Sequence, residues 1–518
     1  MYKCDRVNRV IFAIYSCLIV VAFTDVFVTD VIWHLAVVAI AVLAIAYNLV
    51  GYLFAAIGRI SLKPQPAHTS GQQTIIYMST SMACMAVMLI WFIAYRPGSF
   101  QGDCLNQLGQ ALSDEYIDWH PVWHTLLFYK LPLTITSGRL WSMTLFQMIY
   151  CSLTVGYMCM VIYRYAGIKY MILSWIYVVL NPYTGQMMLY PWKDSAFAMA
   201  SLIGVSMVVD TIMRKRSTGD EVSELKNIYR YVVLGVVLAN AAVFRHNAIL
   251  LVVPLMLAVL LYSEWRNWLV LLVAFLVAMF IIKVPVYNMV QADKVSQPVI
   301  QAVGLPLTII GNVTVETPYM LDEELSDFVY SIAPREVWEN GYTLGNFGVM
   351  KYYYEINETP IEEAGVMNIF RMGLKSLRYS PGPALKAFFA LTDIVYGPDL
   401  LDEGYIGAHI EDNEFGLTEN GNHTVAHILE VYYKIVRLHG YNFLRQSAAS
   451  LMIVLTVFLS KYRLSTLAGW KASAIAIPMF IYAFGTMMLL TSPDSRFFYA
   501  LYMMCPVMIM FGLSEYIR

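Results

Sequence analysis

The chain has 518 residues, of which 59% are hydrophobic and 14% are charged, and its formal net charge is −2. Soluble domains carry about a quarter of charged residues, so this composition indicates a protein surrounded largely by lipid. A net charge this close to zero gives no indication of a nucleic-acid partner. The seven cysteines contain no Cys-x-x-Cys pair and lie mostly in apolar runs, which argues against a disulfide framework or a zinc site.

Long apolar runs follow one another along the chain. A membrane-spanning helix needs about 20 mostly apolar residues. The sequence predicts such helices over residues 8–24, 31–57, 75–95, 141–163, 170–182, 194–213, 229–244, 247–262, 267–284, 446–460, 472–490 and 497–513. The first run lacks a small-residue cleavage site, so we interpret it as a retained helix and not as a signal peptide. The predicted fold class is an all-α polytopic membrane protein with about 12 transmembrane helices.

Lys and Arg are unevenly distributed between the predicted helices. With a cytoplasmic N-terminus, the inner loops and the two termini hold most of these residues, and the short outer loops hold few. The positive-inside rule then predicts twelve spans with both termini in the cytoplasm.

Two longer stretches fall on the predicted outer side. Residues 96–140 form a loop that we expect to contain short helices. Its apolar part, 122–135, is too short at about 1.5 Å per residue to cross a hydrocarbon core of about 30 Å, so we predict a surface or re-entrant helix. Normal charge and turn signals in 285–445 predict a small mixed extracytoplasmic domain. The predicted domains are a transmembrane catalytic module over 1–284, the outer domain over 285–445, and C-terminal transmembrane helices over 446–518.

Polar residues gather at the predicted outer ends of the helices, although they come from distant parts of the chain. Ionisable groups near lipid are costly and usually mark a pathway or a site. The candidate site residues are Asp103, Asn106, Asp118, His120, Lys193, Asp194, Arg245, His246 and Arg496.

The cations of this set suit a phosphate ligand. Lys193, Arg245, His246 and Arg496 are expected to form a cationic pocket at the lipid boundary, and guanidinium groups bind phosphate oxygens in pairs. A lipid-linked phosphate fits such a pocket, because its chain can stay in the bilayer. Asp103 is then placed to act as a general base on an acceptor hydroxyl or as a ligand of a divalent metal.

Each residue also has a structural interpretation. Lys193, Arg245 and Arg496 are suited to reach lipid headgroups from helix ends. Asp194 suits the first turn of a helix, and Asp494 is a common turn residue.

The order of these segments resembles that of the GT-C superfamily of integral-membrane glycosyltransferases, which take sugars from polyprenyl-phosphate donors. The likeness is greatest to the bacterial branch related to the protein mannosyltransferases and the lipid A aminoarabinose transferase. "GDCLNQLGQAL" (102–112) resembles the family's Asp-containing loop segment, and "DWHPVWHTLL" resembles its His-Pro motif. "NPYTGQMMLYPWKD" resembles the segment that lines the active site. The likeness covers residues 75–285 well and the C-terminal part only by layout.

This resemblance implies that Asp103 is the catalytic residue and that Arg245 binds the donor phosphate. Lys193, His246 and Arg496, the other cations of the expected pocket, are predicted to bind the same phosphate. Residues expected to shape the acceptor side are Asn106, Asp118, His120 and Asp194. The implied reaction is an inverting sugar transfer to an extracytoplasmic glycan, lipid or protein, at the outer face of a bacterial plasma membrane. Asp103 is followed by Cys104, whereas many relatives have Asp-Glu, so the need for a divalent metal (Mg²⁺ or Mn²⁺, with Asp103 as the only candidate ligand) stays open.

Two other functions fit parts of the pattern. A polysaccharide polymerase or ligase that uses a lipid-diphosphate oligosaccharide has a similar build, but needs more cations along a longer groove. A transporter or flippase of lipid-linked sugars predicts charges at the bilayer midplane, broken helices and repeated halves. Here the charges gather at helix ends and no internal repeat is evident.

Overall fold

The computed structural model describes residues 5–23, 32–63, 65, 68–218, 224–294, 298–397, 407–438 and 447–514. Within these residues every regular element is a helix, and strand-like pairing is limited to isolated bridges. The prediction of an all-α protein is therefore confirmed. The predicted helix ends at 24, 31 and 446, and the termini predicted to be cytoplasmic (1–4 and 515–518), lie outside the described residues.

Every predicted span contains a helix. The helices concerned are α1 (Arg6–Phe23), α2 (Ile32–Arg59), α3 (Ser70–Ala94), α7 (Ser142–Val179), α9 (Lys193–Thr218), α10 (Glu224–Phe244), α11 (Ile249–Leu260), α12 (Trp265–Ile281), α22 (Ser447–Lys461), α23 (Leu467–Ser473), α24 (Ile477–Met487) and α25 (Tyr499–Leu513). The two spans predicted at 141–163 and 170–182 both fall largely in α7. This helix is broken at Gly167, where a φ of 80° favours glycine.

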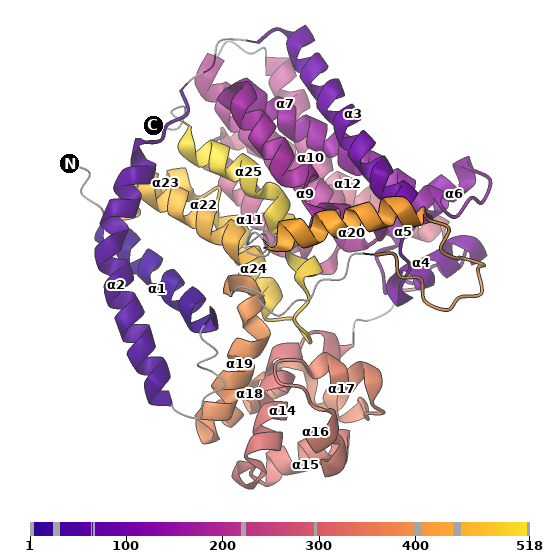
Figure 1. The fold of residues 1–518 in the computed structure, drawn as a ribbon, viewed down its shortest axis with the longest axis vertical. Helices are drawn as coiled ribbons and strands as arrows, with labels where there is room; N and C mark the ends of the chain where they lie inside the picture. The colour runs from indigo at the N-terminus through magenta and orange to yellow at the C-terminus, as the bar shows by residue number, and fades with distance from the viewer. Residues whose placement is uncertain are drawn as a thin grey trace.

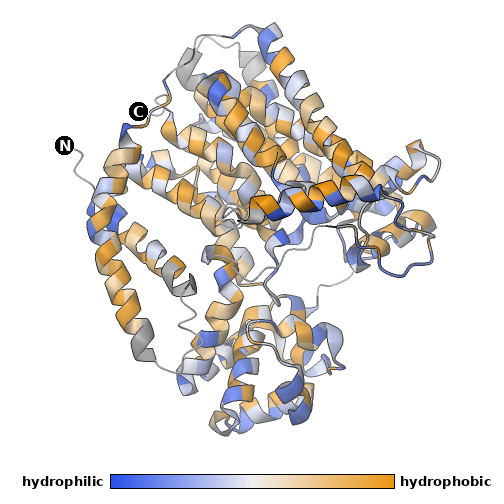
Figure 2. Cartoon of the chain, in the orientation of Figure 1, coloured by the Kyte–Doolittle hydropathy of each residue, from blue (hydrophilic) through white to orange (hydrophobic). Residues whose placement is uncertain are grey.

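Six of the described helices are long and apolar enough to cross a membrane, and a seventh results if α23 and α24, bent by 64°, count as one span. These helices indicate a membrane protein. The apolar parts of α10, α11 and α22 are shorter, so the number of twelve spans stays a prediction. Figure 1 shows α3, α7, α9, α10 and α12 packed side by side, and in Figure 2 hydrophobic residues dominate α2 and α3.

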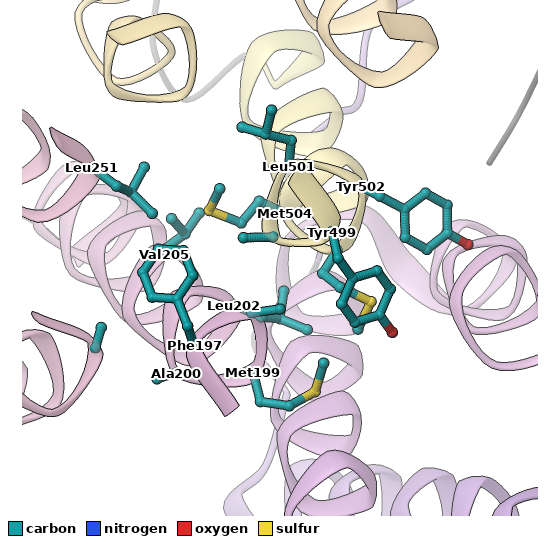
Figure 3. Packing of buried hydrophobic residues seen from close by; sticks show 14 of the residues in the cluster. Phe197, Met199, Ala200, Leu202, Val205, Leu251, Tyr499, Leu501, Tyr502 and Met504 are labelled. Carbon is teal, nitrogen blue, oxygen red and sulfur yellow. The ribbon is translucent and has the colours of Figure 1, made fainter. Parts of the chain in front are cut away.

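The centre of the bundle is formed by α9 and α25, which pack against each other and are buried along most of their length. Figure 3 shows Leu202 and Val205 of α9 beside Leu501 and Met504 of α25, with Leu251 of α11 next to them. Because the side chains interdigitate in a close-packed core, these contacts fix the position of the two helices relative to each other. Because both helices start at the same end of the bundle, the polar residues before them are brought together.

The region 96–140 consists of short helices, as predicted. These are α4 (Gly102–Ser113), α5 (Val122–Thr125), the π-helical turn η2 (Leu126–Lys130) and α6 (Leu131–Ile135). The Tyr129 hydroxyl donates to the carbonyl of Pro191 at 2.8 Å, which ties η2 to the turn before α9.

The prediction of a mixed domain in 285–445 is wrong in its secondary structure, because the described part is helical. It contains α13 (Tyr287–Met289), α14 (Gly304–Glu316), α15 (Glu323–Ile332), α16 (Arg335–Gly341), α17 (Phe347–Tyr353), α18 (Thr359–Tyr379), α19 (Pro381–Tyr396) and α20 (His423–Leu438). Several turn signals are helix starts: Asp322 caps α15 by accepting from the Leu325 amide, and prolines occupy the first turns of α18 and α19.

This region is not packed as one unit. Residues between Ile300 and Met372 share a small core of their own, and α14–α18 lie together below the main bundle in Figure 1. The helix α19 connects this core to the bundle, since it packs on α14 and α18 and also on α22, and α20 packs on α3. The small helical region therefore covers about 300–372, which from here on is called the cap region.

Candidate active site

A cavity of about 580 Å³ lies where the starts of α4, α9 and α25 meet the α10–α11 connection and the cap region. Six of the predicted site residues line it: Asp103, His120, Lys193, Arg245, His246 and Arg496. These residues are up to 393 positions apart in the chain, so only the packing of the bundle brings them together.

The backbone around the cavity favours negative charge. Asp103 lies in the first turn of α4, and Lys193 is the first residue of α9. The first turn of a helix has unpaired N–H groups and a partial positive charge, which favours an acid and disfavours a cation. Lys193 is therefore at a position that costs stability, which points to a ligand-binding role.

Asp103 is surrounded by cations but held by none of them. Its Oδ2 lies 4.0 Å from Lys193 Nζ and 3.7 Å from Arg496 Nη1, and its Oδ1 lies 4.0 Å from His120 Nε2. These distances are longer than hydrogen bonds. The carboxylate is 38% exposed and lines the cavity, so its oxygens are open to a ligand.

The same surroundings set the protonation of two groups. Burial raises the pKa of Asp103, but the charges of Lys193 and Arg496 lower it more, so the pKa lies below its usual value. Burial and the Lys193 charge lower the pKa of His120 to about 4. At neutral pH the site therefore contains an ionised Asp103 beside a neutral His120.

Lys193 also determines which His120 nitrogen carries the proton. Lys193 Nζ lies 2.9 Å from His120 Nδ1, and an ammonium group can only donate. The neutral ring must then carry its proton on Nε2, the nitrogen that faces Asp103. Among the described residues no carboxylate lies within hydrogen-bonding distance of Lys193, which leaves it the least neutralised cation of the cavity.

Arg245 has a different environment, because it is buried in an ion pair. Its Nη1 lies 2.8 Å from Asp194 Oδ1 and donates to the Tyr482 hydroxyl at 3.2 Å and to the Phe497 carbonyl at 3.4 Å. Its guanidinium also lies 4.7 Å from the centre of the Phe497 ring. Asp194 sits behind Arg245 and does not line the cavity. This pair ties the α10–α11 connection to the start of α9, and the bond to Phe497 ties it to the turn before α25.

Arg496 is oriented by neighbours on both sides. Its Nε lies 2.7 Å from Asp494 Oδ2, and its guanidinium lies 4.9 Å from the Trp192 ring centre. Trp192 in turn stacks on Tyr190 at 4.0 Å. Asp494 also accepts from the Arg496 amide at 3.0 Å, which agrees with its interpretation as a turn residue.

Besides Asp194, two predicted site residues, Asp118 and Asn106, lie outside the cavity lining. Asp118 is 3.1 Å from Lys283 Nζ and accepts a hydrogen bond from the Tyr287 hydroxyl at 3.0 Å, so it anchors the loop before His120 to the end of α12. Asn106 is exposed on α4 and accepts from Gln110. Although it is three residues after Asp103 in α4, Asn106 does not line the cavity.

Several lining residues that were not predicted come from the 285–445 region. Tyr352 and Tyr353 of α17 line the cavity, and so does Glu411. Glu411 is placed by backbone pairing, since the Phe100 amide donates to His409 at 2.9 Å and the Glu411 amide donates to Phe100 at 3.0 Å. In the sequence, the run of three tyrosines at 352–354 is the feature that could have indicated a binding surface in this region.

The cavity offers little to a divalent metal. In the described part of the chain, no group of three or more His, Cys, Asp or Glu side chains is arranged to hold an ion. Two cations, Lys193 and Arg496, lie within 4.0 Å of the Asp103 carboxylate and would repel a metal ion. These donors do not fit Mg²⁺ or Mn²⁺, and no step below uses a metal.

Residues 118–333 match the profile of a family of unknown function, DUF6020. The matched range includes His120, Lys193 and Arg245, but not Asp103 or Arg496. No curated protein and no solved structure matches the chain.

Proposed function

We propose that this protein is a membrane glycosyltransferase that transfers a sugar from a polyprenyl-phosphate donor to an extracytoplasmic acceptor. The observation that carries the proposal is the ionised, ligand-accessible Asp103 within 4.0 Å of both Lys193 and Arg496, at one end of an apolar helix bundle. A base beside a phosphate-binding pair of cations is what sugar transfer from a phosphate requires.

The apolar surface beside the cavity supports a lipid-linked donor. The helix α11 begins directly after His246, which lines the cavity, and exposes a stripe of apolar side chains. The stripe consists of Ile249, Val253, Leu257 and Leu261. In the proposed complex the polyprenyl chain lies along such a lipid-facing stripe, and the phosphate reaches the cations of the cavity. We place the reaction at the outer face of a bacterial plasma membrane.

Lys193 and Arg496 are the proposed ligands of the phosphate. In the part of the chain that the structure describes, no carboxylate lies within hydrogen-bonding distance of Lys193, and Arg496 keeps its Nη1 3.7 Å from Asp103, on the cavity side. Arg245 contributes its charge from behind, because its guanidinium is already engaged by Asp194.

The reaction is a direct displacement. The acceptor oxygen forms a bond to the anomeric carbon while the bond from that carbon to the phosphate oxygen breaks, and the proton of the acceptor hydroxyl passes to Asp103. The electron pair of the broken bond leaves with polyprenyl phosphate, whose charge Lys193 and Arg496 stabilise. Attack opposite the leaving phosphate inverts the anomeric configuration.

Donor binding also makes Asp103 a better base. Without donor, Lys193 and Arg496 lower the pKa of Asp103. A bound phosphate offsets part of both charges, so the pKa of Asp103 rises only in the donor complex. This coupling limits proton removal to the state in which a sugar is present to be transferred.

The test is donor turnover by the purified full-length protein. With a labelled polyprenyl-phosphate sugar and an envelope acceptor fraction, we expect release of polyprenyl phosphate. Replacement of Lys193 by Met is expected to lower the rate about 100-fold, because one stabilising cation is lost. Lys130→Met is the matched control, since Lys130 pairs with Asp114 outside the cavity.

Other outcomes identify the competing functions. Turnover of a polyprenyl-diphosphate oligosaccharide and not of the monophosphate would replace the proposal with a polymerase or ligase. Movement of an intact lipid-linked sugar across proteoliposomes, with no release of polyprenyl phosphate, would replace it with a transporter.

The pH profile is a further prediction. Asp103 loses its charge only below its lowered pKa, and His120 gains a charge only near pH 4. The value of kcat/KM is therefore expected to be constant from pH 7 to about 5 and to fall below that, because both titrations remove the active state. A decline centred near 6.5, the ordinary value of histidine, would show that His120 is not held neutral by the fold.

A further inference from the structure

Two exposed tyrosines stand at the cavity beside the proposed reacting groups. The side chains of Tyr352 and Tyr353 are 65% and 80% exposed, and both line the cavity. Burial and the Asp103 carboxylate raise the pKa of Tyr352, which places its hydroxyl within electrostatic range of Asp103. Large aromatic side chains left open to solvent at a cavity commonly mark a binding surface.

The tyrosines are presented by a well-anchored helix. Phe347 and Met350 of α17 are fully buried in the core of the cap region. The Gly348 amide donates to the carbonyl of Thr491 at 2.9 Å, which links α17 to the loop before Arg496. The backbone that carries the two rings therefore has a fixed position relative to the loop before Arg496.

The space between these rings and Asp103 is polar. Glu411 lines it, and its carboxylate has no side-chain partner among the described residues. An ideal Cβ on Gly102 would lie 3.7 Å from Glu411 Oε2, so this oxygen sits over the start of α4, next to Asp103. Gln101 and Gln301 also line the cavity and offer both donors and acceptors.

We infer that the acceptor is a saccharide without negative charge near its accepting hydroxyl, held between the rings of Tyr352 and Tyr353 and the carboxylate of Glu411. This inference rests on the proposed function and specifies its acceptor. The apolar C–H faces of a sugar ring pack on aromatic rings, while its hydroxyls donate to Glu411. One hydroxyl of the bound acceptor saccharide then faces both Asp103 and the anomeric carbon of the donor.

The two other acceptor classes fit this surface less well. One mode of peptide binding, main-chain pairing with a strand edge, has no strand to use here, because the described residues contain only isolated bridges. A lipid acceptor needs an apolar groove, whereas Gln101, Gln301 and Glu411 line this part of the cavity. The unneutralised Glu411 disfavours an anionic group beside it.

The experiment uses the turnover assay with one envelope acceptor fraction treated in three ways. Periodate, quenched before use, destroys the vicinal diols of saccharides; protease digests proteins; and solvent extraction removes lipids. We expect only periodate to abolish sugar transfer, and we expect the acceptor activity to be found among neutral oligosaccharides. Loss of acceptor activity after protease or after extraction would overturn the saccharide assignment.

Single substitutions test whether these residues form the acceptor-binding surface. Tyr352→Ala and Tyr353→Ala are each expected to raise the KM for the neutral oligosaccharide fraction about tenfold, with a smaller change in kcat, because an aromatic contact is lost. Glu411→Gln is expected to raise the same KM. The matched control is Tyr319→Ala, since Tyr319 is 79% exposed in the same region but does not line the cavity.

The failure of the inference differs from the failure of the proposed function. If wild-type protein releases polyprenyl phosphate but both tyrosine variants keep the wild-type KM for the acceptor, the acceptor surface is wrong and the transferase stands. If wild-type protein releases none, the proposed function fails. In that case tyrosine-dependent binding of the neutral oligosaccharide fraction, measured by titration, would still support a saccharide site, and its absence would overturn both.

Discussion

Asp103→Asn is expected to lower kcat for sugar transfer about 10³-fold, because the substitution removes the group that accepts the proton of the acceptor hydroxyl. The KM for the donor is expected to stay the same or to fall. Asparagine carries no negative charge to compete with the donor phosphate for Lys193 and Arg496, which lie within 4.0 Å of Asp103. This combination of a lower kcat without a higher donor KM distinguishes loss of a base from loss of a phosphate site.

The matched control for this variant is Asp114→Asn. Asp114 ends the same helix, α4, and its exposed carboxylate pairs with Lys130. It has a φ of 61°, a conformation that asparagine tolerates, and exposed ion pairs contribute little stability. The control is expected to keep wild-type kcat. Wild-type kcat in Asp103→Asn as well would remove Asp103 from the mechanism.

Arg245→Ala is expected to destabilise the protein by about 3–5 kcal/mol, because it leaves the buried carboxylate of Asp194 without its partner. Asp194 is 1% exposed and Arg245 is 9% exposed, so water cannot replace the lost contact. The expected result is a clear decrease in the thermal unfolding midpoint of the detergent-solubilised protein, followed by tryptophan fluorescence.

A double variant separates the ion pair from simple loss of side-chain volume. Asp194→Asn with Arg245→Met removes both charges and keeps most of the packing, and it is expected to recover more than half of the lost stability. Additive effects of the two single changes would contradict a paired role. Such a result would leave Arg245 free to bind the donor phosphate directly.

Much of the fold follows from local patterns. Apolar runs predicted the positions of the helices in the bundle, and the prediction of short helices in 96–140 is met by α4, α5 and α6. The break at Gly167 lies in the predicted connection between the spans 141–163 and 170–182, whereas the helical structure of the cap region was not predicted. Turn residues such as Asp322 have the same preference for loops and for helix starts, so their presence alone does not distinguish a mixed domain from a helical one.

The sequence predicted most of the residues that form the candidate site, but it did not predict the contacts between them. Charged residues next to apolar runs are costly inside the hydrocarbon core and are therefore found at helix ends. For this reason Asp103, Lys193 and Arg496 could be expected at one end of the bundle. The environment of Arg245 could not be expected, since its partners Tyr482 and Phe497 are more than 200 residues away in the chain. The same holds for Asp118, whose partner Lys283 lies 165 residues away.

The sequence by itself determined that this protein is helical, rich in helices able to cross a membrane, and polar at particular helix ends, because hydrophobic periodicity and charge placement act over short distances along the chain. The tertiary structure decided which of those polar groups meet. The packing of α9 against α25 leaves Asp103 open between Lys193 and Arg496 and buries Arg245 against Asp194. It also brings Tyr352, Tyr353 and Glu411 to the same cavity, since burial and pairing depend on the positions of segments that are distant in the chain.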